Sequence, residues 1–339
     1  MSLLDLPDEL LHKIYETMRP RMRASTFKGL YACTRFVGLF QAAIQRLRNI
    51  HSDFIHLLTR MNTTRMVVET SPRLIWNDSR LTGHHCRILA EIMKFNVIPN
   101  LTSINLGHNV IGNVGAIATV RCAMAAGIGQ LYSIRLNSCG IGGSGACAIA
   151  LAAIAGYLTG IEELLLDNNL ICDTGAEELI KACEGMPRLD TLYLNQNLLG
   201  EASAKAIALA GMRGHMQQME ELRLDDNAIG DGGAQALCDM LTTGHTLPNL
   251  QLLTLHHNDF DEHLRANLNA TGRLNVPKYL HVDEVLHFNG VNEPYQHDNN
   301  PMPEDDDADD SHEQLIQELL DPAHKPNDNY YDDEYGYVS

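Results

Sequence analysis

Residues 131–146 read LYSIRLNSCGIGGSGA, and residues 161–176 read IEELLLDNNLICDTGA. Both segments carry apolar residues at their first, fourth and sixth positions, Cys or Asn at the ninth, and Gly-Ala at the end. The same pattern, L-x-x-L-x-L-x-x-N-x-I-G-x-x-G-A, extends to both sides with some degeneracy. Its ninth position falls on residues 109, 139, 169, 197, 227 and 258. This regular spacing of 28 to 31 residues predicts an array of stacked repeats.

The residue types of one repeat indicate a short strand followed by a helix. In the L-x-L part, the period of two sends both leucines to one face of a strand. The Asn amide can donate to and accept from backbone groups in the turn after the strand. The G-x-x-G-A part is typical of a helix start lying close to its own strand, and Thr174 and Glu177 have capping-box spacing. One repeat cannot bury its own apolar face, so the repeats must stack.

The pattern resembles the ribonuclease-inhibitor type of leucine-rich repeat over roughly 180 to 210 residues. The resemblance implies an α/β solenoid, shaped like a horseshoe, with a parallel sheet on the concave side and helices outside. It also implies that ligands are held by exposed strand residues. The family includes ribonuclease inhibitor, Ran GTPase-activating proteins and many receptors and adaptors, so the fold alone does not select a partner.

We divide the chain into four parts. Residues 1–50 form a small helical segment, and residues 51–98 form a linker and a degenerate capping repeat, in which Leu74 and Trp76 align with Ile104 and Leu106. Residues 99–285 hold the repeats, and a last strand is possible around residues 280–282. Residues 286–339 are rich in Asp, Glu, Asn, Pro and Tyr, which predicts a disordered acidic tail.

Outward residues of the predicted strands form the candidate binding face. An open sheet face with varied polar and aromatic side chains is a plausible docking site, with Tyr193 as a central anchor. The middle of the face carries more acids than bases, which favours a protein partner with a basic surface. Any single position could instead only solvate the exposed sheet. The residues assigned to this face are Arg135, Asn137, Glu163, Asp167, Tyr193, Asn195, Glu221, Arg223, Asp225 and His256.

The N-terminal segment LPDELLHKI, residues 6–14, predicts a helix start with apolar residues at helical spacing. It resembles the opening of an F-box, although the segment that follows is about three residues longer than the usual pattern. The resemblance implies binding to a Skp-type adaptor of a cullin-RING ubiquitin ligase. The alternative is a helical hairpin that only caps the solenoid. The residues implied in adaptor binding are Leu6, Pro7, Leu10, Leu11 and Ile14.

Charge and composition argue against several function classes. The formal net charge is -18, and residues 293–339 hold fifteen acids against one base, so nucleic-acid binding is disfavoured. We expect neither a secretory signal nor a membrane span, because the N-terminus lacks a basic start and long apolar core, and the most apolar stretch, residues 146–158, is too short. The eight cysteines form no C-x-x-C pair, which favours reduced thiols in the cytoplasm or nucleus.

No catalytic, cofactor or metal site is expected. The sequence holds sixteen histidines but no H-E-x-x-H, no G-x-S-x-G and no phosphate-binding glycine loop. His256 and His257 are expected to be adjacent on a strand and to point to opposite faces, which would prevent chelation of one ion.

These observations predict a protein-binding module without enzymatic activity. Its expected role is the substrate-recognition subunit of a cullin-RING ubiquitin ligase, in the cytoplasm or nucleus of the cell, or of a host cell if an intracellular pathogen or virus makes it. Two other interpretations stay open. One is a Ran-type GTPase-activating protein, a family that combines such repeats with an acidic C-terminal region, and the other is a non-catalytic inhibitor or scaffold.

Overall fold

A computed structural model describes residues 34–94, 100–127, 129–243 and 246–271, with the backbone only for residues 34–44 and 47. The residues implied in adaptor binding, the possible last strand and the predicted acidic tail lie outside the described residues. No helix in these described ranges is long and apolar enough to cross a membrane.

Seven strands form one parallel sheet whose order follows the sequence. Each strand pairs with the next in a constant register; for example, Ile134 lies opposite Leu164 and Leu164 lies opposite Leu192. The predicted α/β solenoid with a parallel sheet is therefore confirmed. The strands are β1 (Arg73–Ile75), β2 (Ser103–Asn105), β3 (Ser133–Arg135), β4 (Glu163–Leu165), β5 (Thr191–Tyr193), β6 (Glu221–Arg223) and β7 (Leu252–Thr254).

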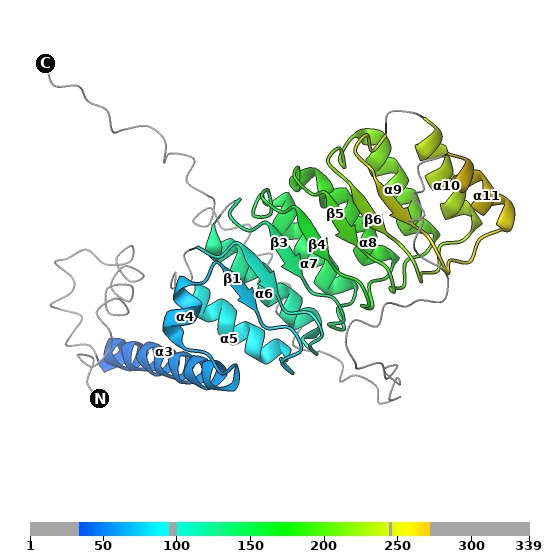
Figure 1. Ribbon diagram of the computed structural model, residues 1–339. Helices are drawn as coiled ribbons and strands as arrows, with labels where there is room; N and C mark the ends of the chain where they lie inside the picture. Colours follow the sequence, from blue (N-terminus) through cyan, green and yellow to red (C-terminus); the bar gives the residue numbers. More distant parts are fainter. Residues whose placement is uncertain (1–33, 95–99, 128, 244–245, 272–339) are drawn as a thin grey trace, which may run out of the picture.

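Helices form a second layer along one face of the sheet, and each packs against the helix of the next repeat (Figure 1). We call the opposite face of the sheet the concave face. The helices are α3 (Thr34–Arg60), α4 (Arg65–Thr70), α5 (Gly83–Met93), α6 (Gly112–Ala126), α7 (Gly143–Ile154), α8 (Asp173–Lys181), α9 (Glu201–Arg213), α10 (Asp231–Thr242) and α11 (Glu262–Ala270), and a 3-10 turn η3 (Ala182–Gly185) follows α8.

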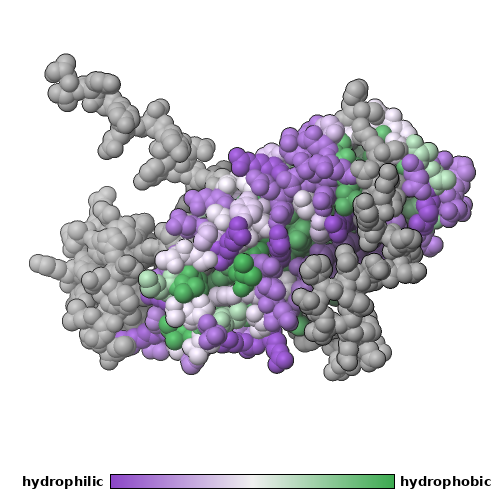
Figure 2. All heavy atoms as spheres, in the orientation of Figure 1, coloured by the Kyte–Doolittle hydropathy of each residue, from purple (hydrophilic) through white to green (hydrophobic). Residues whose placement is uncertain are grey.

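The core lies between the sheet and the helices. The middle residue of each strand points into it, and these residues are at most 3% exposed: Leu74, Ile104, Ile134, Leu164, Leu192, Leu222 and Leu253. Small residues on the helices, such as Ala146 and Ala176, are also fully buried, so the helices lie close to their strands. Hydrophilic residues cover much of the surface seen in Figure 2, and apolar residues form separate smaller areas between them.

The ninth residue of each repeat links neighbouring turns through its side chain. Asn169 is a clear case: its Oδ1 accepts from the amides of Cys139 and Ile141 at 3.0 and 2.9 Å. Its Nδ2 donates to the carbonyls of Leu136 and Leu166 at 2.9 and 3.0 Å. The residue before each ninth position has a left-handed φ between 52° and 56°, which turns the chain away from the strand. Buried backbone groups in these turns are thereby paired.

The starts of α7 and α9 receive hydrogen bonds from a side chain of the preceding repeat. Asn113 Oδ1 accepts from Gly142 and Gly145 at the start of α7, and Asp173 does the same for Gly200 and Ser203 at the start of α9. The capping box predicted at Thr174 and Glu177 is wrong, because α8 begins at Asp173 after Cys172. At α7 and α9 the helix start is therefore capped across the repeat boundary.

The first helices close one end of the core. Phe54, Leu57 and Leu58 of α3 are at most 3% exposed, and α3 packs against α5. Strand β1 pairs with β2 with Leu74 opposite Ile104, and Trp76 is buried beside it in the same core. These contacts continue the repeat pattern up to the edge of the sheet.

Candidate functional site

Strand residues on either side of each buried leucine face the concave surface. Glu163 and Leu165 flank Leu164, and both are partly exposed, as are Tyr193 and Arg223 on the next two strands. All ten residues that the sequence assigns to the concave face lie in β3 to β7 or directly after these strands, and none of them is fully buried. Their role in ligand binding remains a prediction.

A hollow of about 370 Å³ opens among these residues. It extends from the turn after β1 to β6, and we call it the concave pocket. Of the ten predicted residues, Arg135, Asn137, Asp167, Tyr193, Asn195 and Arg223 line it, whereas Glu163, Glu221, Asp225 and His256 do not. The remaining lining residues are Asn77, Asn105, His108 and Leu165.

Among the lining residues outside this set, Asn77 belongs to the degenerate repeat before residue 99, which contributed no residue to the predicted face. It follows Trp76 as Asn137 follows Leu136, so the same repeat register would have found it. Gly107 holds this position in the second repeat, and a Cβ added there would come within 2.3 Å of Asn137 Oδ1. The missing side chain therefore gives Asn137 room to reach His108, which it contacts at 3.0 Å.

One side of the pocket is formed by an ion pair. Arg135 Nη2 lies 2.8 Å from Glu163 Oε2, and Ser133 Oγ donates to the same oxygen at 2.9 Å. Burial alone would raise the pKa of Glu163, but the hydrogen bonds from Arg135 and Ser133 outweigh it and hold the pKa below its ordinary value. Arg135 is therefore neutralised from within the protein.

The other side is formed by three linked side chains. The guanidinium of Arg223 lies over the ring of Tyr193, 4.2 Å from its centroid, and 3.6 Å from Glu221. The Tyr193 hydroxyl donates to Glu221 at 2.6 Å. Burial, followed by this hydrogen bond, raises the pKa of Tyr193 to about 12, so the hydroxyl stays protonated at neutral pH. The aromatic anchor is thus held rigidly before any ligand arrives.

Asp167 lies between these two groups. Burial raises the pKa of its carboxyl above the ordinary value, although its own backbone amide, His108 and Arg223 oppose this effect. Within the described residues, the carboxylate has no ion-pair partner within 4.0 Å. Two further buried atoms there, Asn195 Oδ1 and Arg223 Nε, have no hydrogen-bond partner in the same part of the chain. These two atoms are enclosed by the protein, so Asp167 is the acid of the pocket lining that has no ion-pair partner among the described residues.

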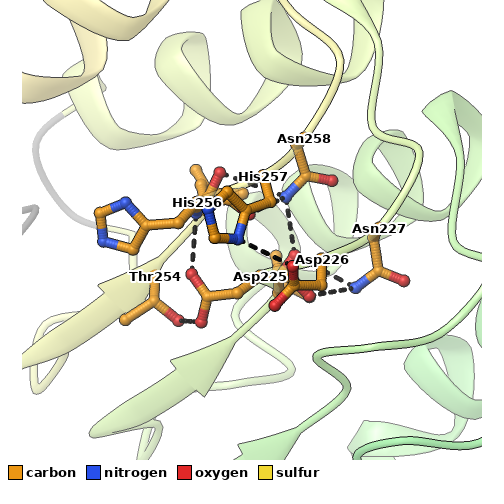
Figure 3. A network of polar contacts seen from close by, with 9 residues as sticks. Asp225, Asp226, Asn227, Thr254, His256, His257 and Asn258 are labelled. Carbon is orange, nitrogen blue, oxygen red and sulfur yellow. Dashed lines mark hydrogen bonds and ion pairs between the residues drawn. The ribbon is translucent and has the colours of Figure 1, made fainter. Parts of the chain in front are cut away.

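Near the last described strand, two acids and two histidines form a polar network (Figure 3). Asp225 accepts from the Thr254 hydroxyl and, at 2.8 Å, from the amide of His256. Asp226 Oδ1 lies 2.8 Å from His257 Nδ1. Asp225 and Asp226 thus tie the turns after β6 and β7 together.

The two histidines do not lie on a strand, which corrects the expectation from the sequence. Strand β7 ends at Thr254, and His257 has a φ of 53° in the turn that follows. Both histidines are exposed, and within the described residues it is the His257 ring that contacts an acid, whereas His256 reaches Asp225 through its backbone amide. No group of three or more His, Cys, Asp or Glu side chains that could hold a metal occurs among the described residues.

Comparisons with known proteins agree with the repeat assignment. A family model described as "Leucine Rich repeat" matches residues 97–118 and 215–238. The chain is 31% identical over 171 residues to "NACHT, LRR and PYD domains-containing protein 5" of Homo sapiens, which covers 50% of this chain and 14% of that protein. It is 30% identical over 166 residues to "Ribonuclease inhibitor" of Sus scrofa, which covers 48% of this chain and 34% of that protein.

The chain spans about a third or less of the length of these curated relatives. Among solved structures, "Plant peptide hormone receptor RGFR1 in complex with RGF2" matches 58% of this chain and 30% of that chain, at a TM-score of 0.34 and 18% identity. The chain therefore folds as a solenoid of stacked leucine-rich repeats, and it is similar in sequence to part of a ribonuclease inhibitor.

Proposed function

We propose that the concave face binds a protein ligand with a basic surface, and that residues 1–50 join the chain, through a Skp-type adaptor and a cullin, to a ubiquitin ligase. In this role the repeats select the substrate, and the covalent chemistry belongs to other subunits. We place this activity in the cytoplasm or nucleus, and in a host cell if the source is an intracellular pathogen or virus.

The concave pocket supports the first half of the proposal. Tyr193 is fixed by Arg223 and Glu221 in the middle of the sheet, and its ring remains partly exposed. A rigid aromatic residue beside desolvated polar groups is typical of binding hot spots, because little side-chain entropy remains to be lost on association. The pig relative is named for the inhibition of an enzyme, a role that also requires a protein ligand.

The excess of acids near the pocket indicates the sign of the charge on the partner's surface. Arg135 and Arg223 are already paired with Glu163 and Glu221, so they offer little attraction to an acidic surface. Asp167 adds a charge that no ion pair within the described residues offsets. Complementary charges steer association and suppress wrong partners, which favours a basic surface on the ligand.

The ligand-binding half is tested by quantitative capture with the full chain as bait. We compare wild type with Tyr193→Ala and with the control Tyr132→Ala, which removes another partly exposed tyrosine outside the pocket. A ligand of the concave face should lose at least about tenfold in recovery with Tyr193→Ala, since hot-spot residues contribute about 2 kcal/mol or more. It should be unaffected by Tyr132→Ala. Equal losses, or no loss with Tyr193→Ala, would contradict concave binding.

The adaptor-binding half rests on the sequence match at residues 6–14 and needs a separate test. Purified Skp-type adaptor is mixed with the wild-type chain or with Leu10→Asp/Ile14→Asp, and complex formation is measured by size-exclusion chromatography. We expect a complex with wild type only. No complex with either would reject the ligase role and leave a helical cap, and stimulation of GTP hydrolysis by Ran would then support the GTPase-activating alternative.

A further inference from the structure

The concave pocket holds an unbalanced negative charge. Arg135 and Glu163 cancel at 2.8 Å, and Arg223 and Glu221 cancel at 3.6 Å, which leaves Asp167 between the two pairs. A partner that covers the pocket removes water from this carboxylate. Burying an unpaired carboxylate is costly, so binding is favourable only if the partner supplies a positive charge there.

Asp167 lines the hollow, and its carboxylate offers two acceptor oxygens to an incoming group. A guanidinium carries five N–H donors in a flat fork and can bond to two acceptors at once, whereas an ammonium acts as a point charge. The volume of about 370 Å³ is ample for one such side chain.

We propose that the concave pocket binds a single basic side chain of the protein partner, arginine in preference to lysine, with Asp167 as its counter-ion. This inference rests on the proposed concave binding of a protein and adds the chemistry of its anchor residue.

An acidic side chain fits this pocket less well. To reach Arg135 or Arg223 it would have to compete with Glu163 or Glu221, which already hold these guanidinium groups. It would also be placed next to Asp167. Like charges at such close range are repulsive, and their interaction is strong where water is scarce.

The test uses short probes in place of the unknown partner. Four peptides, acetyl-Gly-X-Gly-amide with X as Arg, Lys, citrulline or Glu, are titrated into the full chain at physiological ionic strength by calorimetry. The proteins are wild type, Asp167→Asn and the control Asp239→Asn. The control also removes one negative charge, but on the exposed outer surface of α10, so it reports attraction to the net charge alone.

The Arg peptide should bind wild type more tightly than the Lys peptide, and at least about tenfold more tightly than the citrulline peptide, which has nearly the same shape but no charge. Asp167→Asn should weaken Arg binding at least about tenfold, and Asp239→Asn by less than about twofold. Thermal melting checks folding, and Asp167→Asn should melt no lower than wild type because it removes a buried charge.

Equal binding of Arg and citrulline, stronger binding of Glu than of Arg, or no Arg binding at about 10 mM peptide would overturn the inference. An equal loss of Arg binding in both variants would also overturn it, because the attraction would then come from net charge. Protein capture that depends on Tyr193 can still succeed in these cases, and then only the inference fails. Peptide binding without protein capture has the opposite meaning: the pocket assignment stands and the proposed function fails.

Discussion

Cys139 occupies a position that is Asn in the five other repeats of the pattern. Its thiol donates to the carbonyl of Leu106 at 3.2 Å, and burial raises its pKa to about 12, so it stays protonated. In the next repeat Asn169 Oδ1 accepts from the amides of residues 139 and 141. By the same register, an oxygen at position 139 would face the amides of Asn109 and Ile111, where sulfur is only a weak acceptor.

We therefore predict that Cys139→Asn stabilises the protein. The expected gain in the free energy of unfolding is about 1 kcal/mol, the usual net contribution of a buried hydrogen bond. Urea denaturation followed by circular dichroism measures it. Cys139→Ala, which removes the thiol and adds no acceptor, should instead destabilise. A loss of stability in Cys139→Asn comparable to that of Cys139→Ala would show that the turn cannot accommodate the amide.

For single residues, the sequence predicts which face of the sheet a side chain lies on better than it predicts which side chains it contacts. The period of two correctly predicts that Glu163, Tyr193 and Arg223 face outward, because successive side chains of a strand point to opposite faces of the sheet. It does not show that Tyr193 bonds Glu221 or that Asp167 lacks an ion pair among the described residues, since these depend on side chains about 30 residues away in the sequence. The ten residues assigned to the concave face therefore include residues of the pocket together with residues outside it.

Among the elements, helix α9 depends on a residue of the preceding repeat. Asp173 accepts from the Gly200 amide at 2.7 Å, from the Ser203 amide at 3.0 Å and from the Ser203 hydroxyl. A carboxylate at this end of a helix also complements the helix dipole. A capping-box motif concerns residues within one repeat, so it does not predict this contact between repeats.

Asp173→Ala should lower the free energy of unfolding by about 1–2 kcal/mol at neutral pH, as other lost helix caps do. Burial alone would raise the pKa of Asp173, but the hydrogen bonds from Ser203 and Gly200 hold it below its ordinary value. Its contribution is therefore complete above the unfolded-state pKa, and it is lost as the pH falls through the lower folded-state pKa.

The measurement is urea denaturation of wild type and Asp173→Ala at several pH values between neutral and acidic. The stability difference should shrink as the pH approaches and passes the folded-state pKa. Glu184→Ala serves as control, because this side chain is 78% exposed and should change little. A difference that stays constant down to the lowest pH at which the protein is folded would assign the effect to packing and not to the charged cap.

For the whole molecule, the sequence predicts the stack because the repeat period and the buried leucines are local and regular. The distance between neighbouring repeats depends on contacts between individual residues of adjacent helices. A Cβ added to Gly175 would come 2.7 Å from Gly143 Cα and 2.9 Å from Gly143 O, both backbone atoms. A Cβ at Gly230 would meet nothing closer than Asp259 O at 3.8 Å. Helix α8 therefore approaches α7 as closely as it does only because position 175 has no side chain.

Gly175→Ala should push these two helices apart and cost about 1–3 kcal/mol, the usual penalty of overpacking, whereas Gly230→Ala should change stability by less than about 0.5 kcal/mol. Because repeats contact only their neighbours, a weakened interface in the middle of the stack should also divide its unfolding into two steps. Trp76, the only tryptophan of the chain, lies on the N-terminal side of this interface, so its fluorescence reports that side alone. Fluorescence and circular dichroism should give one common urea transition for wild type and two separate ones for Gly175→Ala. Coincident transitions in the variant would mean that the stack unfolds as one unit even across a strained interface.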